Sequence, residues 1–291
     1  MTVLTGSYTR GCLEATTRTL LDQEAIDRAY RKDDGHLTRS YAHAVKRGGG
    51  LAQEALDNGE QLFSGNAGTD FGTVVDRAIA MAVAGVPLDS RFVVPPEDVL
   101  SNGARRGKAY TEWKAENTDK TEVSAADWFR LNRIIANTFR CTAMQEIVDA
   151  TDDMQAAFRY EDANGHKRKS LADGVTQAFL WDFKTTSSEW HDLWRSCDSF
   201  GYLWQAAWYV DAAMACGWPH HHLRFVFAQT FKPFRVRVVT LPEELVENAR
   251  EEIKVTLDQI RLRRELNVYR SPEDDEVTEL EFPAFFTGGR R

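Results

Sequence analysis

The sequence predicts an α/β (α+β) protein in which a mixed central β-sheet is flanked by helices. Helical patterns dominate residues 1–140, whereas strand patterns begin after residue 150. A long apolar helix separates two groups of strands and a second helix follows the last strand, an order typical of a mixed sheet covered by helices. We expect one domain over residues 1–291, with a mostly helical part at 1–140, a core at 150–266 and an acidic tail at 267–291.

The N-terminal part is expected to contain helices at 14–30, 71–85 and 124–140. The helix at 71–85 is so apolar that we expect it to be buried, and Asp76 is its acidic residue. The helix at 124–140 is amphipathic and begins at Ser124, a typical N-cap residue. Three consecutive glycines at residues 48–50 predict a flexible turn.

In the middle of the chain the pattern changes to short strands. The segment 154–162 reads as a strand or the end of a helix, and a turn with the sequence ANGH follows it. Further strands are expected at 167–175, 176–186, 221–230 and 234–241, the last two as a hairpin. Long helices are expected at 199–217, where the pattern is largely apolar, and from Pro242 to Leu266.

Composition indicates a globular protein of the cytoplasm. Hydrophobic residues make up 43% of the chain and charged residues 27%, so a sizeable core is expected. No run of about 18 apolar residues predicts a membrane span, and the N-terminus lacks the pattern of a signal peptide. The four cysteines are far apart, which favours reduced thiols over a disulfide framework or a cysteine zinc site: Cys12, Cys141, Cys197 and Cys216.

The formal net charge of −8 argues at first against a nucleic-acid partner, but the charge is unevenly distributed. The tail carries a run of acidic residues at 273–281, whereas the segment 212–242 has no Asp or Glu and several basic residues. A second basic group lies in the sequence GARRGK at 103–108. These two segments are able to meet phosphates, although a basic surface patch is more often simply solvated.

Three charged residues stand in the otherwise apolar stretch LADGVTQAFLWDFKTT, which reads as two adjoining strands. Asp182 and Lys184 are two apart and therefore share one face of a strand. A hairpin would place Asp173 opposite Asp182, and two carboxylates so close favour a hard divalent cation between them. Lys184 then suits orienting a water molecule and offsetting charge on a phosphorane. A structural ion pair is the competing interpretation of these residues.

The helix that follows adds two polar residues to this set. Gln205 and Tyr209 are four apart and lie on one face of a helix that is apolar enough to be buried. Taken alone, they read as hydrogen-bonded core residues. About twenty residues after a DxK strand, they read as part of the same site.

The pattern Asp173, Asp182-x-Lys184, then Gln205-x-x-x-Tyr209 resembles the PD-(D/E)xK nuclease superfamily in its RecB-like branch. The likeness is closest to the RecE type, the exonuclease VIII nuclease domain of phages and prophages. Segments that carry it are LTRSYAHAV, FGTVVDRAI, RRGKAYTEWKAEN, VSAADWFRLNRII, RYEDANGHKRKSLADGV, DFKTT and FGYLWQAAWY. The resemblance implies a restriction-endonuclease-like core with an N-terminal helical elaboration.

Carried over to this chain, the resemblance implies a role for each residue of the motif. Asp173 and Asp182 would bind the metal, with the Phe183 carbonyl as a third ligand. Lys184 would be the catalytic lysine, and Gln205 and Tyr209 would complete the catalytic set. The residues expected to contact DNA are Arg105, Arg106, Lys108, Thr185 and Thr186.

The chain departs from the family pattern at two positions. Asp76 stands where the family usually has a histidine ligand, and its oxygen suits Mg²⁺. Gln155 stands where a glutamate is usual on the first strand, with Glu161 nearby, which puts metal occupancy in doubt. The expected cofactor is Mg²⁺, with Mn²⁺ as a possible substitute. An iron–sulfur cluster is not expected, because no cysteine follows Cys216.

The function that the resemblance implies is a Mg²⁺-dependent deoxyribonuclease, more narrowly a double-strand 5′–3′ exonuclease of phage-type recombination. Its expected partners are double-stranded DNA with ends, a single-strand annealing protein and further copies of the chain in a trimer or tetramer. Two alternatives stay open. One is an endonuclease of a defence system, and the other is a nuclease-derived DNA-binding or interaction protein that has lost turnover.

Overall fold

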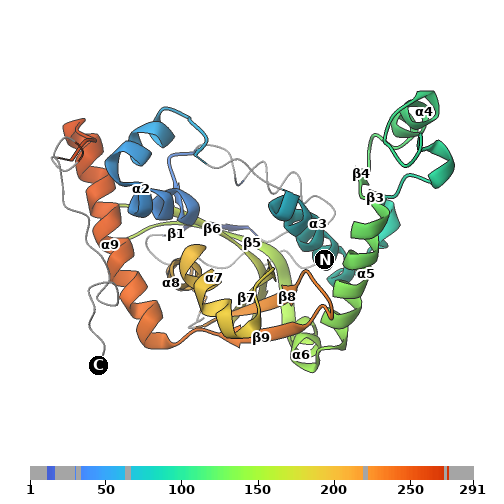
Figure 1. The fold of residues 1–291 in the computed structure, drawn as a ribbon. Helices are drawn as coiled ribbons and strands as arrows, with labels where there is room; N and C mark the ends of the chain where they lie inside the picture. The colour runs from blue at the N-terminus through green and yellow to red at the C-terminus, as the bar shows by residue number, and fades with distance from the viewer. Residues whose placement is uncertain are drawn as a thin grey trace, which may run out of the picture.

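A mixed β-sheet with helices on both faces forms the body of the protein (Figure 1). The structure is a computed structural model that describes residues 12–16, 30, 34–62, 67–218, 222–271 and 274. The predicted fold class is therefore confirmed. No helix among these residues is long and apolar enough to cross a membrane.

Within the described residues the sheet has seven strands, in the order β1-β5-β6-β7-β8-β9, with β2 beside β6. The strands are β1 Cys12–Thr16, β2 Leu37–Thr38, β5 Thr151–Glu161, β6 Lys167–Thr176, β7 Leu180–Thr186, β8 Leu223–Gln229 and β9 Val236–Thr240. The pairs β2–β6 and β7–β8 are parallel, and the other neighbours are antiparallel. The four strands predicted between residues 167 and 241 are all present, and the segment 154–162, left open as a strand or a helix end, is part of β5. Strands β8 and β9 form the predicted hairpin, which is antiparallel.

Helices cover both faces of this sheet, and α4 lies on a separate arm. The helices are α2 Arg39–Asp57, α3 Ala67–Val83, α4 Lys108–Glu116, α5 Ala125–Arg140, α6 Thr142–Ala150, α7 Leu193–Ser199, α8 Tyr202–Ala215 and α9 Glu243–Leu266. The helices predicted at 71–85, 124–140, 199–217 and after Pro242 are confirmed as α3, α5, α8 and α9. Ser124 is the N-cap of α5, since its hydroxyl accepts a hydrogen bond from the Asp127 N–H at 3.0 Å.

Two local predictions are wrong. Residues 14–16 belong to β1 rather than to a helix, because the edge of β5 offers backbone partners that outweigh local propensity. The remainder of the helix predicted at 14–30, apart from the helical Tyr30, lies outside the described residues. The glycines at 48–50 make a kink inside α2, where Gly49 has φ of 65°, rather than a flexible turn.

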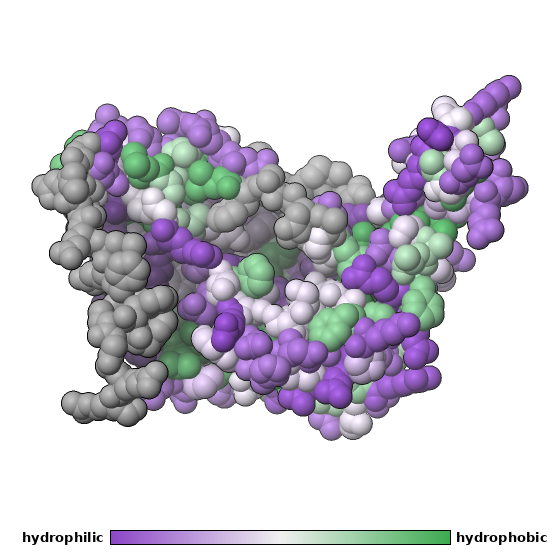
Figure 2. Space-filling view, viewed as in Figure 1, coloured by the Kyte–Doolittle hydropathy of each residue, from purple (hydrophilic) through white to green (hydrophobic). Residues whose placement is uncertain are grey.

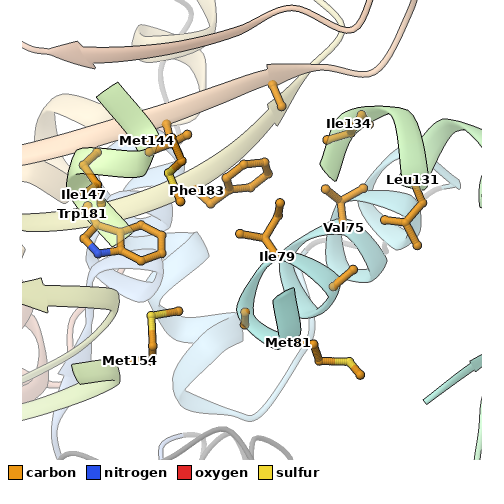
Figure 3. Packing of buried hydrophobic residues seen from close by; sticks show 14 of the residues in the cluster. Val75, Ile79, Met81, Leu131, Ile134, Met144, Ile147, Met154, Trp181 and Phe183 are labelled. Atoms are coloured by element: carbon orange, nitrogen blue, oxygen red, sulfur yellow. The ribbon is translucent and has the colours of Figure 1, made fainter. Parts of the chain in front are cut away.

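One face of the sheet is covered by α3, α5 and α6. Apolar side chains of these helices pack against Trp181 and Phe183 of β7 (Figure 3). Phe183 points from the strand toward Ile79 of α3 and Met144 of α6. The side chains of Trp181 and Phe183 therefore anchor β7 in this core, which leaves the alternate residues Asp182 and Lys184 facing away from it.

The opposite face is covered by α8, and α2 and α9 pack outside α8. Polar contacts join the two outer helices. Gln53 Nε2 of α2 donates to the Ile260 carbonyl at 2.9 Å, and Arg264 Nη2 of α9 donates to Asp57 Oδ1 at 2.6 Å. The helix that carries Gln205 and Tyr209 is thus enclosed between the sheet and these two helices.

Residues 88–122 form an arm that projects from the body beside α5 (Figure 1). It contains the parallel strand pair β3 Phe92–Val93 and β4 Thr121–Glu122, together with α4. Arg77 Nη1 of α3 donates to Thr121 Oγ1 at 3.4 Å at the base of the arm. The outer surface of the arm is mostly hydrophilic (Figure 2).

The free energy of unfolding should depend on pH through His43 of α2. Burial, followed by the charges of Arg39, Arg47 and Lys46, lowers its pKa from 6.5 to about 4, against the opposing charge of Asp198. Between these two pH values the unfolded chain binds a proton that the folded protein does not. The free energy of unfolding should therefore fall by about 2 kcal/mol from pH 7 to pH 4 through this residue, less than the full pKa difference gives, because solvent screens the charges around a half-buried ring.

Urea unfolding of the wild type and of His43→Gln at both pH values measures this contribution. The wild type should lose more stability than the variant on acidification. Equal losses would show that the folded state does not depress the pKa of His43.

Candidate active site

The polar cluster forms where β6 and β7 separate. The two strands pair only at Gly174 with Trp181 and at Val175 with Leu180. Beyond that point the Asp173 carboxylate occupies the place of a strand partner and accepts a hydrogen bond from the Phe183 N–H at 2.7 Å. The predicted hairpin therefore brings Asp173 next to the DxK segment of β7.

Asp182 is the centre of the cluster, and only 2% of its surface is exposed. It forms an ion pair with Lys184, and its other oxygen accepts a hydrogen bond from Gln205 Nε2 of α8 at 2.6 Å. The Gln205 carbonyl oxygen is buried and has no hydrogen-bond partner among the described residues. Gln205 thus contributes to the site directly and is not a core residue satisfied elsewhere.

The charges in this cluster act strongly on one another. Burial and then the negative charges of Asp182 and Asp76 hold the pKa of Asp173 well above its usual value. Burial opposes the charge of Lys184, but the three carboxylates outweigh it and raise the pKa of the ammonium. Lys184 is therefore a permanent cation at neutral pH, suited to stabilising negative charge and unsuited to accepting a proton.

Asp76 lies on α3, which approaches β7 closely beside the site. A Cβ atom added to Gly72 of α3 would stand 3.1 Å from Thr185 Oγ1, so this approach leaves little room for a side chain. Asp76 itself is exposed and acts through its charge on Asp173 and Lys184. The structure brings this predicted ligand within electrostatic reach of the cluster.

Gln155 of β5 lies opposite Asp173 in the antiparallel register, and its Nε2 donates to Asp173 Oδ1 at 3.3 Å. Its φ of 55° is unusual for a residue in a strand other than glycine. The position at which the sequence resemblance predicted a glutamate is therefore filled by a buried amide that hydrogen-bonds to the cluster. Glu161, at the far end of β5, is exposed and does not take its place.

Two tyrosines of α8 adjoin the cluster. Burial and then the charge of Asp182 raise the pKa of Tyr209 well above its usual value, so its phenol stays protonated. Tyr202 is an addition that the motif does not include: Lys184 Nζ lies 5.9 Å from the centre of its ring. The sequence could have indicated this contact, because Tyr202 is three positions before Gln205 and therefore lies on the same helical face.

The remaining predicted DNA contacts lie in two places. Thr185 and Thr186 follow Lys184 on β7, and the Thr186 hydroxyl accepts from the Ser188 N–H at 3.0 Å. The residues Arg105, Arg106 and Lys108 lie on the arm, outside the cluster. Arg105 Nε is 2.8 Å from Glu122 Oε1 and Lys108 Nζ is 3.7 Å from Glu112 Oε1, whereas Arg106 is exposed.

The donor set fits a hard divalent cation. Three carboxylates face one ammonium, which leaves an excess of negative charge, and the unpartnered Gln205 oxygen adds a neutral oxygen donor. No three His, Cys, Asp or Glu side chains in the described part of the chain converge as a metal-binding group. Asp173 and Asp182 are the residues that would hold the ion, and Asp76 is the third carboxylate whose charge acts on the cluster.

The comparisons with known proteins place the fold. No family model matches the sequence, and no curated protein matches it. The crystal structure of a Eubacterium rectale protein, provisionally named an exonuclease, aligns with a TM-score of 0.54 over 93% of this chain and 96% of that one. The identity is 14%, so the likeness shows a shared fold over nearly the whole chain.

A second solved structure is the alkaline exonuclease of Laribacter hongkongensis. It is 16% identical and covers 58% of this chain and 86% of its own, with a TM-score of 0.29. A TM-score this low does not establish a common fold.

Proposed function

We propose that the protein is a Mg²⁺-dependent deoxyribonuclease that hydrolyses phosphodiester bonds at the Asp173–Asp182–Lys184 cluster. The observation that carries this proposal is the splayed β6–β7 hairpin, where two carboxylates and a lysine held as a cation meet at one point. The shared fold with a protein provisionally named an exonuclease supports it.

Each residue of the cluster then has a physical role. A divalent cation held by Asp173 and Asp182, with the Phe183 carbonyl as a further oxygen ligand, would supply Lewis-acid activation of the phosphate. Lys184 stabilises the negative charge that develops on the phosphorane and orients the attacking water. Gln205 holds Asp182 in place through its 2.6 Å hydrogen bond. Tyr209, protonated and near both aspartates, is available as a hydrogen-bond donor to the substrate.

More narrowly, we propose a double-strand 5′–3′ exonuclease of the RecE type that acts in phage-type recombination together with a single-strand annealing protein. The motif order and its spacing support this branch. The alternative of a DNA-binding protein without turnover draws its support from Gln155, an amide where the family has a carboxylate.

The proposal includes a homo-oligomer, trimeric or tetrameric, in which an acidic protein holds DNA through a basic lining. The segments 224–238 and 103–108 supply candidates for that lining. Arg235 and Arg237 line a surface pocket of about 360 Å³ together with Arg140 of α5. Light scattering tests the oligomer, and particles of about 33.0 kDa alone would exclude a ring.

Asp76→Ala is expected to weaken Mg²⁺ binding and activity by tenfold or more, because the charge of Asp76 acts on Asp173 and Lys184. Asp76→His should retain part of the activity and prefer Mn²⁺, which accepts imidazole more readily. Asp70→Ala, an exposed acid on the same helix, is the matched control. Wild-type cleavage by Asp76→Ala at limiting Mg²⁺ would remove this residue from the site.

The experiment that tests the proposed function is digestion of end-labelled linear duplex DNA with Mg²⁺ and with EDTA. Cleavage is expected only with Mg²⁺, and Lys184→Ala should reduce it by about 10²-fold or more. Lys254→Ala, at an exposed position of α9, controls for the loss of a positive charge. A relaxed or nicked circular plasmid cut as fast as the linear form would indicate an endonuclease, and binding without cleavage would favour the DNA-binding alternative.

A further inference from the structure

Phe200, in the turn between α7 and α8, exposes 59% of its surface although it lies beside the buried cluster. Its ring stacks on that of Tyr202, with centroids 5.9 Å apart and planes inclined by 30°. One side of the Phe200 ring is thus supported by protein, whereas most of the ring faces solvent. An aromatic ring held in this way is available to stack on a planar ligand.

The row of aromatic rings leads from Phe200 to the reacting centre. Tyr202 is 7% exposed and packs against Phe225 and Phe227 of β8, with centroids 5.4 and 5.5 Å away. The Lys184 ammonium lies 5.9 Å from the centre of the same Tyr202 ring. Two contacts of this length separate Phe200 from Lys184. Because a duplex strand advances about 3.4 Å per nucleotide, Phe200 faces bases within a few nucleotides of a phosphate at Lys184.

The backbone that carries Phe200 is fixed by α2. Arg39 Nη1 donates to the Phe200 carbonyl at 3.0 Å, and Arg47 Nη1 donates to the Ser199 carbonyl at 2.8 Å. The next residue, Gly201, has φ of 65°, and a Cβ there would lie 2.5 Å from His43 Nε2. A ring on a backbone held by two hydrogen bonds from another helix loses little conformational entropy when a ligand stacks on it.

The charge around this turn suits a polyanion. Arg39, Lys46 and Arg47 of α2 act on His43 together with one acid, Asp198. Lys46 is paired with Glu252, whereas the two arginines bind main-chain carbonyls, which are neutral, in the described part of the chain. Two guanidinium groups beside an exposed aromatic ring form the combination that binds single-stranded nucleic acid, where bases stack and phosphates meet cations.

We propose that Phe200 is a stacking platform for an unpaired base of the DNA strand whose phosphate reaches Asp173, Asp182 and Lys184. The inference rests on the proposed function and adds a substrate preference: the strand enters the site with one or more bases unpaired. The protein should therefore bind a frayed or overhanging end more tightly than a blunt, stable one.

The test uses duplexes that carry 2-aminopurine, a base whose fluorescence reports stacking, at the terminal nucleotides of an overhang. Binding is measured with the full-length protein in EDTA, so that no cleavage occurs. Wild type should change the fluorescence on binding, and Phe200→Ala should lose that change and bind roughly tenfold more weakly. Phe200→Trp should restore both. Phe129→Ala, which removes an aromatic residue 54% exposed on α5, is the matched control and should behave as wild type.

In parallel assays with Mg²⁺, Phe200→Ala should raise KM more than it lowers kcat, because stacking stabilises bound substrate and transition state alike. Wild-type fluorescence and affinity in Phe200→Ala would overturn the platform even if the protein cuts DNA. A fluorescence change that depends on Phe200 in a protein without cleavage would uphold the platform and overturn the proposed turnover. Loss of the oligomer in Phe200→Ala with DNA binding unchanged would assign the ring to a contact between copies instead.

Discussion

Asp182→Asn is expected to reduce DNA cleavage by 10²- to 10³-fold or more while the protein stays folded. The substitution keeps the size of the side chain but removes the charge that pairs with Lys184. An amide can still accept the hydrogen bond from Gln205, so the packing between β7 and α8 should be kept. The NH₂ group would, however, face either Lys184, from which it cannot accept a hydrogen bond, or the cation, which it cannot ligate.

Single-turnover cleavage of labelled duplex, circular dichroism and thermal unfolding together measure this result. Asp119→Asn, the same substitution at an exposed position of the arm, should be active and serves as the matched control. Activity of Asp182→Asn close to wild type would show that the buried ion pair is structural.

Gly174→Ala should destabilise the protein by roughly 1–3 kcal/mol or more and reduce activity with it. A Cβ at this position would lie 2.1 Å from Trp181 Nε1 and 2.2 Å from Cε2. Trp181 is fully buried and its Nε1 donates to Thr151 Oγ1 at 3.0 Å, so the ring has no free space into which it can move. The strain would fall on the two residue pairs that join β6 to β7, directly beside Asp173.

Urea unfolding of a double-mutant cycle tests the stated cause. In a Trp181→Leu background, whose side chain ends before the ring atoms that the added methyl would strike, Gly174→Ala should cost much less free energy. An equal cost in both backgrounds would mean that the contact with Trp181 is not what excludes a side chain at residue 174.

The core of the candidate site could be predicted from the sequence because it is local. Asp173, Asp182 and Lys184 lie on two strands joined by a short turn, so the period of two and the hairpin suffice to place them together. Gln205 follows on the next long helix. A buried carboxylate such as Asp182 needs a hydrogen-bond donor, and Gln205 is the donor that it has. The fold class followed from the same strand and helix patterns.

The rest depends on contacts between distant segments. Whether Asp76 reaches the cluster is decided by the close approach of Gly72 to Thr185, about a hundred residues later, which no local pattern encodes. The exposure of Phe200 is likewise a property of the folded surface, since aromatic residues in such a sequence are more often core. Residues 14–16 pair with β5 for a similar reason, because an available strand edge decided their conformation.

The packing of α2 against α9 has a consequence for the order in which the protein folds. Gln53 and Ile260 are 207 residues apart, whereas Asp173, Asp182 and Gln205 meet across 32 residues or fewer. During synthesis the hairpin and α8 can assemble early from short-range contacts, but the face of α8 that packs against α9 stays uncovered until α9 has left the ribosome. The apolar surface of α8 is therefore fully buried only late in synthesis. A chain that is slowed or truncated before α9 would expose this surface and aggregate through it.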